Sequence, residues 1–182
     1  MSRVEPVLRV ATLEDAQRVD ALIKESAAAI FPRYYDQRAT ASAVRHVAQV
    51  DPILIADGTY FVLETDGDLV ACGGWSRRDR LYSGSDSSAG DSRLLDPLTE
   101  PARVRAMFVR QDWLRRGLGR RILDECARAA RREGFGRLFL GSTLPGVQFY
   151  LAYGFEPVEE REVELADGAR FACVFMEKAI AG

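Results

Sequence analysis

The sequence predicts an α/β (α+β) fold in which helices pack on a mixed β-sheet, arranged as one domain over residues 1–182. Two observations support this prediction. Apolar runs of strand length recur along the chain, and two pairs of them are separated by Asp-Gly, at residues 66–67 and 167–168, as in β-hairpins. Between these pairs, a strand-like run leads through a glycine turn into an amphipathic helix at residues 118–132.

The overall composition is that of an ordinary globular protein. Of the 182 residues, 47% are hydrophobic and 29% are charged, and the net charge is −2. A domain of this length buries about 70% of its unfolded surface, so its stability requires neither disulfides nor a metal. The nearly neutral charge gives no general attraction to nucleic acid or to anionic membranes, so we expect neither as a partner.

Cysteine and histidine usage gives no sign of a metal site. Cys72, Cys126 and Cys173 are far apart and the chain has one histidine, so we expect no bound metal. The odd number of cysteines argues against a secreted disulfide framework. The N-terminus lacks the apolar core of a signal peptide, and no apolar run approaches the roughly 20 residues of a membrane span. We therefore expect a soluble cytoplasmic protein.

The first part of the chain predicts a strand followed by two helices. Residues 8–11 form a short apolar strand, and residues 13–29 form a helix that Pro32 ends. A second helix is expected over residues 42–50, closed by Asp51-Pro52.

A long polar segment separates the first hairpin from the rest of the chain. The hairpin strands are expected at residues 60–63 and 69–72. Residues 76–101 are rich in Ser, Asp and Gly, and they predict a long loop that is mobile without ligand. The elements expected after this loop are strands at 103–109, 137–140, 158–165 and 169–177, a long helix at 118–132, and a short helix at 147–153.

The segment that indicates a function is the turn Arg115-Arg116-Gly117-Leu118-Gly119-Arg120, between a strand and the long helix. The first turn of a helix has unpaired N–H groups and the positive end of the helix dipole, so it binds phosphate well. Glycines allow the backbone to approach an anion closely, and arginines add charged contacts. The alternative is a solvated helix face with a common Gly-x-Gly. The turn is neither a Rossmann fingerprint nor a Walker loop, since the third glycine and the Gly-Lys-Ser/Thr are missing.

A second segment, Phe149-Tyr150-Leu151-Ala152-Tyr153-Gly154-Phe155, follows the next strand and predicts a short helix. Tyr150 and Tyr153 are three residues apart, so they are neighbours on the helix surface. Taken alone, such an aromatic cluster more often packs in a core than takes part in chemistry.

Together, the two segments resemble the GCN5-related N-acetyltransferases (GNAT family) over about residues 103–158. The resemblance implies a central mixed, mostly antiparallel sheet of six or seven strands flanked by about four helices. It also implies acetyl-CoA as co-substrate. In the family, the strand before the turn binds the pantetheine arm, which corresponds here to Met107, Phe108 and Val109. The family's pyrophosphate loop corresponds to Leu114, Arg115, Arg116, Gly117, Leu118, Gly119 and Arg120.

The resemblance assigns the catalytic proton donor to Tyr150, four residues before Gly154. The tyrosine of the family protonates the departing thiolate, and the ordinary pKa of a tyrosine hydroxyl, about 10, suits a donor. The resemblance also places Tyr34 and Tyr35 in the region that commonly shapes the acceptor cleft, with a packing role as the equal alternative. It places the 76–101 loop on the acceptor side.

The sequence departs from the family pattern at three points. Leu114 replaces the usual Gln or Arg of the pyrophosphate loop, and Ser142 and Thr143 stand where an asparagine is often found. The family often has a glutamate on the strand at residues 103–108, where this chain has none. A neutral amine is needed for attack, and deprotonating a lysine-like amine at pH 7 costs roughly 4.6 kcal/mol. The substitutes considered for the missing base are Glu64, Asp86, Asp91 and Glu100.

The resemblance therefore implies an N-acetyltransferase in which an amine attacks acetyl-CoA directly. The acceptor stays open between a small-molecule amine and a protein or peptide amine, and a homodimer is also left open. The competing interpretation is a non-catalytic acyl-CoA-binding sensor or regulatory module of the same fold, which the missing glutamate and Leu114 favour. A nucleotide-phosphate binder of another fold is a further alternative, and the missing Walker lysine and third glycine argue against it.

Overall fold

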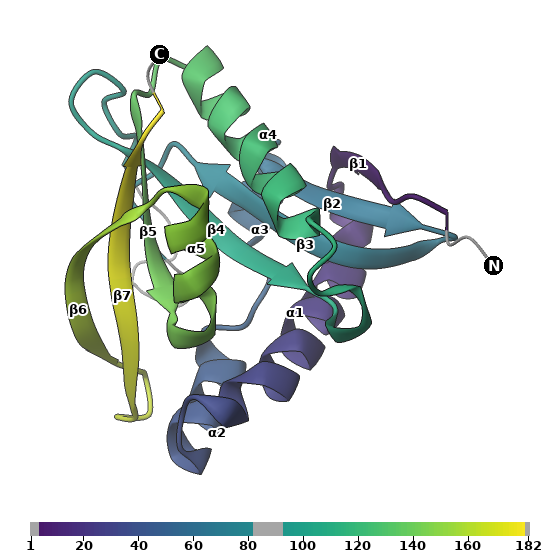
Figure 1. Cartoon of the computed structure of the whole chain (residues 1–182), viewed down its shortest axis with the longest axis vertical. Helices are drawn as coiled ribbons and strands as arrows, with labels where there is room; N and C mark the ends of the chain where they lie inside the picture. Colours follow the sequence, from purple (N-terminus) through teal and green to yellow (C-terminus); the bar gives the residue numbers. More distant parts are fainter. Residues whose placement is uncertain (1–3, 82–92, 181–182) are drawn as a thin grey trace.

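The computed structural model describes residues 4–81 and 93–180 of the 182-residue chain. These residues form a seven-stranded mixed sheet, as expected, with five α-helices where about four were expected (Figure 1). The strand order across the sheet is β1-β2-β3-β4-β5-β7-β6. The strands are β1 (Val7–Val10), β2 (Tyr60–Thr65), β3 (Asp68–Ser76), β4 (Ala102–Val109), β5 (Arg137–Thr143), β6 (Glu156–Glu164) and β7 (Arg170–Ala179). The helices are α1 (Ala16–Ile30), α2 (Gln37–His46), α3 (Pro52–Ala56), α4 (Leu118–Arg132) and α5 (Val147–Tyr153).

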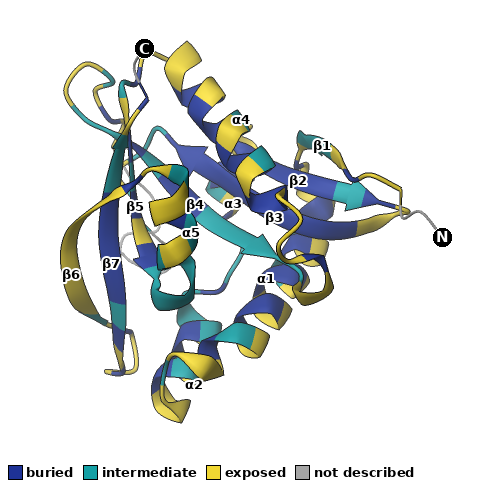
Figure 2. Ribbon diagram, viewed as in Figure 1, coloured by how far each residue is buried: buried dark blue, intermediate teal, exposed yellow. Residues whose placement is uncertain are grey.

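Two hydrophobic cores lie on the two faces of the sheet. One core joins α4 and α5 to the sheet, and the other joins α1, α2 and α3 to it. The side chains of β2 alternate between them, since Phe61 and Leu63 belong to the α4 core while Tyr60 and Val62 belong to the α1 core. Figure 2 shows β2 and β3 mostly buried, β4 largely intermediate and the edge strand β6 exposed. None of the helices in the described part of the chain is long and apolar enough to cross a membrane.

The sheet opens between β4 and β5. These two strands are parallel, and they pair only at Ala102 with Leu138 and at Arg103 with Phe139. Beyond this point β5 continues to pair with β7 as far as Thr143, whereas β4 pairs only with β3. The edge of β4 that faces β5 is therefore unpaired over residues 104–109, and the two strands diverge (Figure 1).

Several predicted elements are confirmed. Helices α4 and α5 have the expected bounds, and Gly154 follows α5 with a φ of 109°, in the left-handed region that favours glycine. The hairpin between β2 and β3 turns at Asp66 and Gly67, whose φ values are 50° and 82°. Positive φ at both central residues matches the right-handed twist of the strands, which explains the Asp-Gly pair.

Two expectations for the N-terminal helices were wrong in their bounds. The second helix begins at Gln37 instead of residue 42, because the Asp36 carboxylate accepts a hydrogen bond from the N–H of Ala39 (2.7 Å) and caps the helix. Pro52 begins α3 instead of closing a helix, with the Asp51 carboxylate accepting from Ile53 N (3.0 Å). Proline suits the first turn of a helix because its missing N–H has no partner there.

The expected loop at residues 76–101 is structured at both ends. Arg78 forms an antiparallel bridge with Leu94, and the N–H of Leu95 donates to the carbonyl of Arg77 (2.8 Å). Leu95 is buried in the α4 core. Residues 82–92 lie outside the described residues, so the mobility expected for them stays a prediction.

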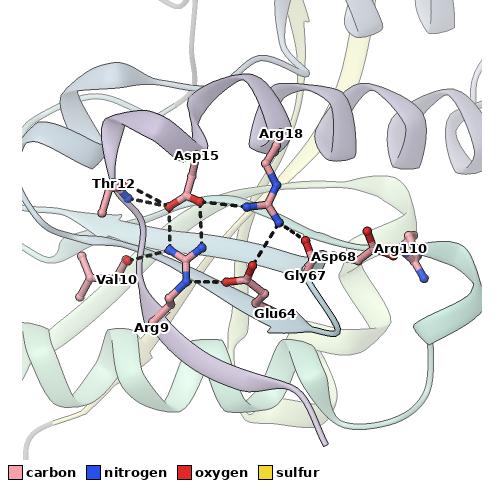
Figure 3. A network of polar contacts seen from close by, with 9 residues as sticks. All are labelled: Arg9, Val10, Thr12, Asp15, Arg18, Glu64, Gly67, Asp68 and Arg110. Carbon is pink, nitrogen blue, oxygen red and sulfur yellow. Dashed lines mark hydrogen bonds and ion pairs between the residues drawn. The ribbon is translucent and has the colours of Figure 1, made fainter. Parts of the chain in front are cut away.

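A charged network joins the start of the chain to the sheet (Figure 3). Asp15 is buried and accepts from both terminal nitrogens of Arg9 (2.7 and 2.8 Å) and from the N–H of Thr12 (2.8 Å). Glu64 on β2 accepts from Arg9 Nε (2.7 Å) and from Arg18 on α1 (3.2 Å). Hydrogen bonds from Arg9 hold the pKa of the Asp15 carboxyl well below its usual range and lower that of Glu64.

We expect Asp15→Asn to lower the free energy of unfolding at pH 7 by about 1–2 kcal/mol, because hydrogen bonds to a charged partner are lost. A carboxyl whose pKa is lowered by folding stabilises the protein above its unfolded value, about 3.9 for Asp, and loses this effect as pH falls through the folded value. The difference between wild type and variant should therefore be full at neutral pH and shrink below about pH 4. Urea unfolding across this pH range tests it. Glu159→Gln is the control, since its pair with Arg161 is exposed. An equal effect of both substitutions would contradict the prediction.

Candidate active site

A cavity of about 100 Å³ lies where β4 and β5 diverge. Residues 104–108 of β4 form one wall and residues 140–143 of β5 form another. Val47 and Leu81 line it from the segments after α2 and β3, and Gly146 and Tyr150 line it from the start of α5. Of the predicted site residues, Met107, Phe108 and Tyr150 contact this cavity, and Val109 follows on the same strand.

Strand β4 has a bulge at the cavity wall. Two residues, Ala106 and Met107, oppose the single residue Gly73 of β3, and Ala106 has a φ of 45°. The buried hydroxyl of Tyr60 donates to the carbonyl of Ala106 (2.7 Å) and holds the bulge in place. Burial raises the pKa of Tyr60 well above its usual value, so the hydroxyl stays protonated and remains a donor.

Glycine is required opposite the bulge. A Cβ on Gly74 would lie 2.4 Å from the carbonyl oxygen of Thr59, and a Cβ on Gly73 would lie 3.2 Å from Met107 Cα. Gly73 thus allows the bulged part of β4 to approach β3 closely, whereas Gly74 allows the backbone at Thr59 and Tyr60 to do so.

The predicted anion-binding turn lies at the start of α4. The first hydrogen bond of the helix runs from Arg121 N to Gly117 O (3.1 Å), so the preceding N–H groups of the first turn have no acceptor within the helix. Arg115 and Gly117 have φ values of 62° and 77°, which turn the chain into the helix. The residues of the turn from Leu114 to Gly117 are exposed, whereas Leu118 and Gly119 are buried.

Two arginines of the turn rest on aromatic rings. The guanidinium of Arg116 lies 4.7 Å from the ring centre of Trp113, and that of Arg120 lies 5.1 Å from the ring centre of Tyr153. The Tyr153 hydroxyl donates to Asp124 (2.7 Å). These contacts hold both guanidinium groups near the start of α4.

The two glycines of the turn serve different purposes. A Cβ on Gly117 would meet nothing within 4 Å, so this residue is glycine because of its left-handed backbone. A Cβ on Gly119 would lie 3.2 Å from the ring of Phe149 on α5. Gly119 is therefore needed for the packing of α4 against α5, a role that the Gly-x-Gly pattern does not reveal.

Tyr150 is nearly buried and reaches the cavity from α5. Its ring packs edge-on against Phe149 and Phe155, with ring centres 5.1 and 5.5 Å away. Burial raises its pKa above the ordinary value for tyrosine. The phenol therefore keeps its proton at neutral pH and can act as an acid.

An arginine lines the cavity, whereas none of the candidate general bases among the described residues does. Neither Glu64 nor Glu100 lines the cavity; Glu64 belongs to the Arg9 network, and Glu100 accepts from Arg93. Arg105 lines it instead, 2% exposed, with Nη2 2.9 Å from Asp51 Oδ2. Asp86 and Asp91 lie outside the described residues. The sequence motifs did not single out Arg105, although a charged residue inside an apolar strand is a signal that could have found it.

Tyr35 is a structural residue beside the cavity. Its hydroxyl donates to the carbonyl of Ala172 on β7 (2.9 Å) and accepts from the N–H of Leu144 (2.7 Å), and its ring stacks on Phe171 at 4.3 Å. It joins the segment between α1 and α2 to β7 and to the turn that follows β5. Tyr34 is 49% exposed and is not part of the cavity wall. Within the described ranges, no group of three or more His, Cys, Asp or Glu side chains could hold a metal ion.

Comparison with known proteins places the chain among acetyltransferases. Residues 56–157, more than half of the chain, match the family described as "Acetyltransferase (GNAT) domain". No curated protein sequence matches. Solved structures of similar fold include a GCN5-related N-acetyltransferase from Rhodopseudomonas palustris, with a TM-score of 0.70 and 19% identity over 98% of both chains.

Two further structures of similar fold contain the coenzyme. PaiA N-acetyltransferase from Thermoplasma acidophilum, in complex with coenzyme A, has a TM-score of 0.68 and 14% identity over 97% of this chain and 99% of its own. The protein yncA from Salmonella typhimurium, with its cofactor acetyl-CoA, has a TM-score of 0.64 and 16% identity over 98% and 96% of the two chains.

Proposed function

Because the chain belongs to the GNAT acetyltransferase family, we propose that it is a cytoplasmic N-acetyltransferase that moves the acetyl group of acetyl-CoA to an amine. The observation that carries this proposal is the cavity at the divergence of β4 and β5, which has the unpaired edge of β4 on one side and Tyr150 on the other. The amine belongs to a small molecule or to a protein or peptide.

Acetyl-CoA would bind along β4 and end at the start of α4. The unpaired backbone of β4 at Met107, Phe108 and Val109 offers hydrogen bonds to the amide groups of the pantetheine arm. The N–H groups of the turn at residues 114–120 would hold the pyrophosphate, with the helix dipole favouring its negative charge. Leu114 does not weaken this arrangement, since the contacts come from the backbone.

The transfer would proceed by direct attack of the amine on the thioester carbon. The C–N bond forms first and gives a tetrahedral oxyanion, which a backbone N–H near Val109 would stabilise. The C–S bond then breaks and the thiolate takes the proton of Tyr150. The amine would give up its own proton to water. Proton exchange with solvent restores Tyr150.

Thiol release over a panel of amines, measured together with acetyl-CoA binding by calorimetry, tests the proposal. We expect micromolar binding and amine-dependent release of CoA thiol. The second candidate, a non-catalytic acyl-CoA sensor, is favoured by Arg105 in place of a base. Binding without thiol release for every amine would support the sensor, and failure of acetyl-CoA to bind would contradict both.

We expect Gly117→Val to weaken CoA binding by about tenfold or more. A non-glycine residue at a φ of 77° costs about 1–2 kcal/mol, and the side chain would project into the open space where the pyrophosphate is placed. Gly119→Ala is the matched control. Its Cβ would press on Phe149 and lower the melting temperature, with a smaller change in affinity. Calorimetry that shows unchanged affinity for Gly117→Val would remove the turn from the binding site.

A further inference from the structure

We infer that the acceptor amine belongs to a molecule that also carries a carboxylate, as in an amino acid, and that Arg105 binds this carboxylate in the cavity. The inference rests on the proposed acetyltransferase function and specifies its substrate class. Arg105 and Tyr150 line the same cavity.

The position of Arg105 places it beside the reacting groups. It precedes the bulge of β4 at Ala106 and Met107, on the part of the strand that has lost its β5 partner. Arg105 lines the cavity and is only 2% exposed, so its guanidinium is held inside the protein and not on the outer surface. A buried arginine on a binding surface is commonly a carboxylate or phosphate ligand, because its planar group donates two parallel hydrogen bonds.

The hydrogen bonds of Arg105 within the described residues are incomplete. Nη2 donates to Asp51 (2.9 Å) and Nη1 donates to the carbonyl of Arg80 (3.2 Å). Nε is buried and has no hydrogen-bond partner among the described residues. An arginine has five N–H donors, so the group retains donors for a ligand.

The charges around Arg105 do not balance. Asp51 Oδ2 faces both Arg105 Nη2 (2.9 Å) and Arg80 Nε (3.6 Å), while Asp51 Oδ1 accepts from Ile53 N. Two guanidinium groups thus share one carboxylate, which leaves these three side chains with a charge of +1. Buried charge is costly unless it is paired, so an anionic group in the cavity would be stabilised.

The other residues that line the cavity also restrict which acceptors can bind. None of the described lining residues is Asp or Glu, and Val47, Leu81 and Leu140 contribute apolar surface. An acceptor with a second cation, such as a polyamine, would be repelled. An amine that carries a carboxylate has no second cation and brings the anionic group that this wall favours.

The test compares acceptors that differ only in the carboxylate. Each amino acid of a panel is assayed against its own carboxamide by thiol release. We expect kcat/KM to favour the acid by about 10²-fold or more for at least one amino acid. The amine of the carboxamide is less basic than that of the acid, so a larger fraction of it is neutral and able to attack. A preference for the acid could therefore not come from a more nucleophilic amine. Equal or better use of the carboxamides throughout would overturn the inference.

Two variants test whether the preference for the acid depends on the cluster of Arg80, Arg105 and Asp51. Arg80→Gln keeps the Arg105–Asp51 pair and brings the charge of the cluster from +1 to 0, and it should raise the KM of the acid more than that of the carboxamide. The double variant Arg105→Met with Asp51→Asn removes the guanidinium without leaving a buried carboxylate, and it should bring the ratio close to one. Arg78→Gln is the matched control, since Arg78 pairs with Asp57 and does not line the cavity. A ratio unchanged in both cluster variants would overturn the assignment to Arg105.

Binding measurements separate this inference from the proposed function. The CoA-loaded protein is titrated with an N-acetyl amino acid and with its carboxamide, which requires no turnover. Tighter binding of the acid, lost in the double variant, supports the inference even if no amine is acetylated. If carboxamides and simple amines are acetylated while neither assay favours the acid, the substrate class is wrong and the acetyltransferase stands.

Discussion

Tyr150→Phe is expected to lower kcat by about 10²-fold while hardly changing the melting temperature or the affinity for CoA. The phenylalanine keeps the ring that packs on Phe149 and Phe155 and removes only the hydroxyl. General acid catalysis is typically worth about 10²- to 10⁴-fold, and the proton is needed only when the thiolate leaves. Stopped assays of thiol release at saturating acetyl-CoA measure this effect.

Tyr153→Phe is the matched control for this prediction. It removes a hydroxyl from the same helix, three residues away, that donates to Asp124 and does not line the cavity. If both substitutions leave kcat intact, Tyr150 only packs in the core and water protonates the thiolate. If Tyr150→Phe lowers the melting temperature and CoA affinity together, its hydroxyl is structural.

The pH dependence gives an independent test of the same residue. Burial raises the pKa of Tyr150 above its ordinary value of about 10, so the phenol loses its proton only at higher pH. The kcat of the wild type should therefore show no fall that belongs to Tyr150 as pH rises toward 10. A fall below pH 9 that disappears in Tyr150→Phe would contradict the assigned protonation state.

Asp51→Ala is expected to lower the free energy of unfolding by about 3–5 kcal/mol, because it leaves the buried Arg105 guanidinium without its carboxylate. For a chain of this size, the melting temperature should fall by on the order of 10 °C. The variant also removes the N-terminal cap of α3, where Ile53 N donates to Asp51. Chemical denaturation and thermal scans measure the loss.

A second capping aspartate separates the two contributions. Asp36→Ala removes the cap of α2, where Ala39 N donates to the carboxylate, but no ion pair of the described residues involves Asp36. It should cost about 1 kcal/mol. The excess loss in Asp51→Ala then reports the buried pair with Arg105. Equal losses of unfolding free energy in the two variants would show that the pair with Asp51 does not stabilise the buried Arg105.

How far the sequence predicts the fold differs between the two halves of the chain. The bounds of α4 and α5 were predicted because their ends are marked by local signals, a glycine turn before Leu118 and a left-handed glycine after Tyr153. The start of α2 was missed although Asp36 is a capping residue, since aspartate is also common in loops. Asp51-Pro52 predicts the end of a helix from the sequence, whereas in the structure it begins α3.

The candidate site, too, was predicted from the sequence only in part. The sequence by itself determined the strand, turn and helix that form the expected coenzyme site, with Tyr150 shortly after, because these motifs lie within short stretches of the chain. Only the tertiary structure decided that Tyr35 ties the segments behind the cavity together and that Gly119 packs against Phe149. It also brought Asp51 to Arg105, 54 residues away, and buried both. The physical reason is that helices, turns and caps depend on neighbours in sequence, whereas burial and charge pairing depend on which segments the folded sheet brings together.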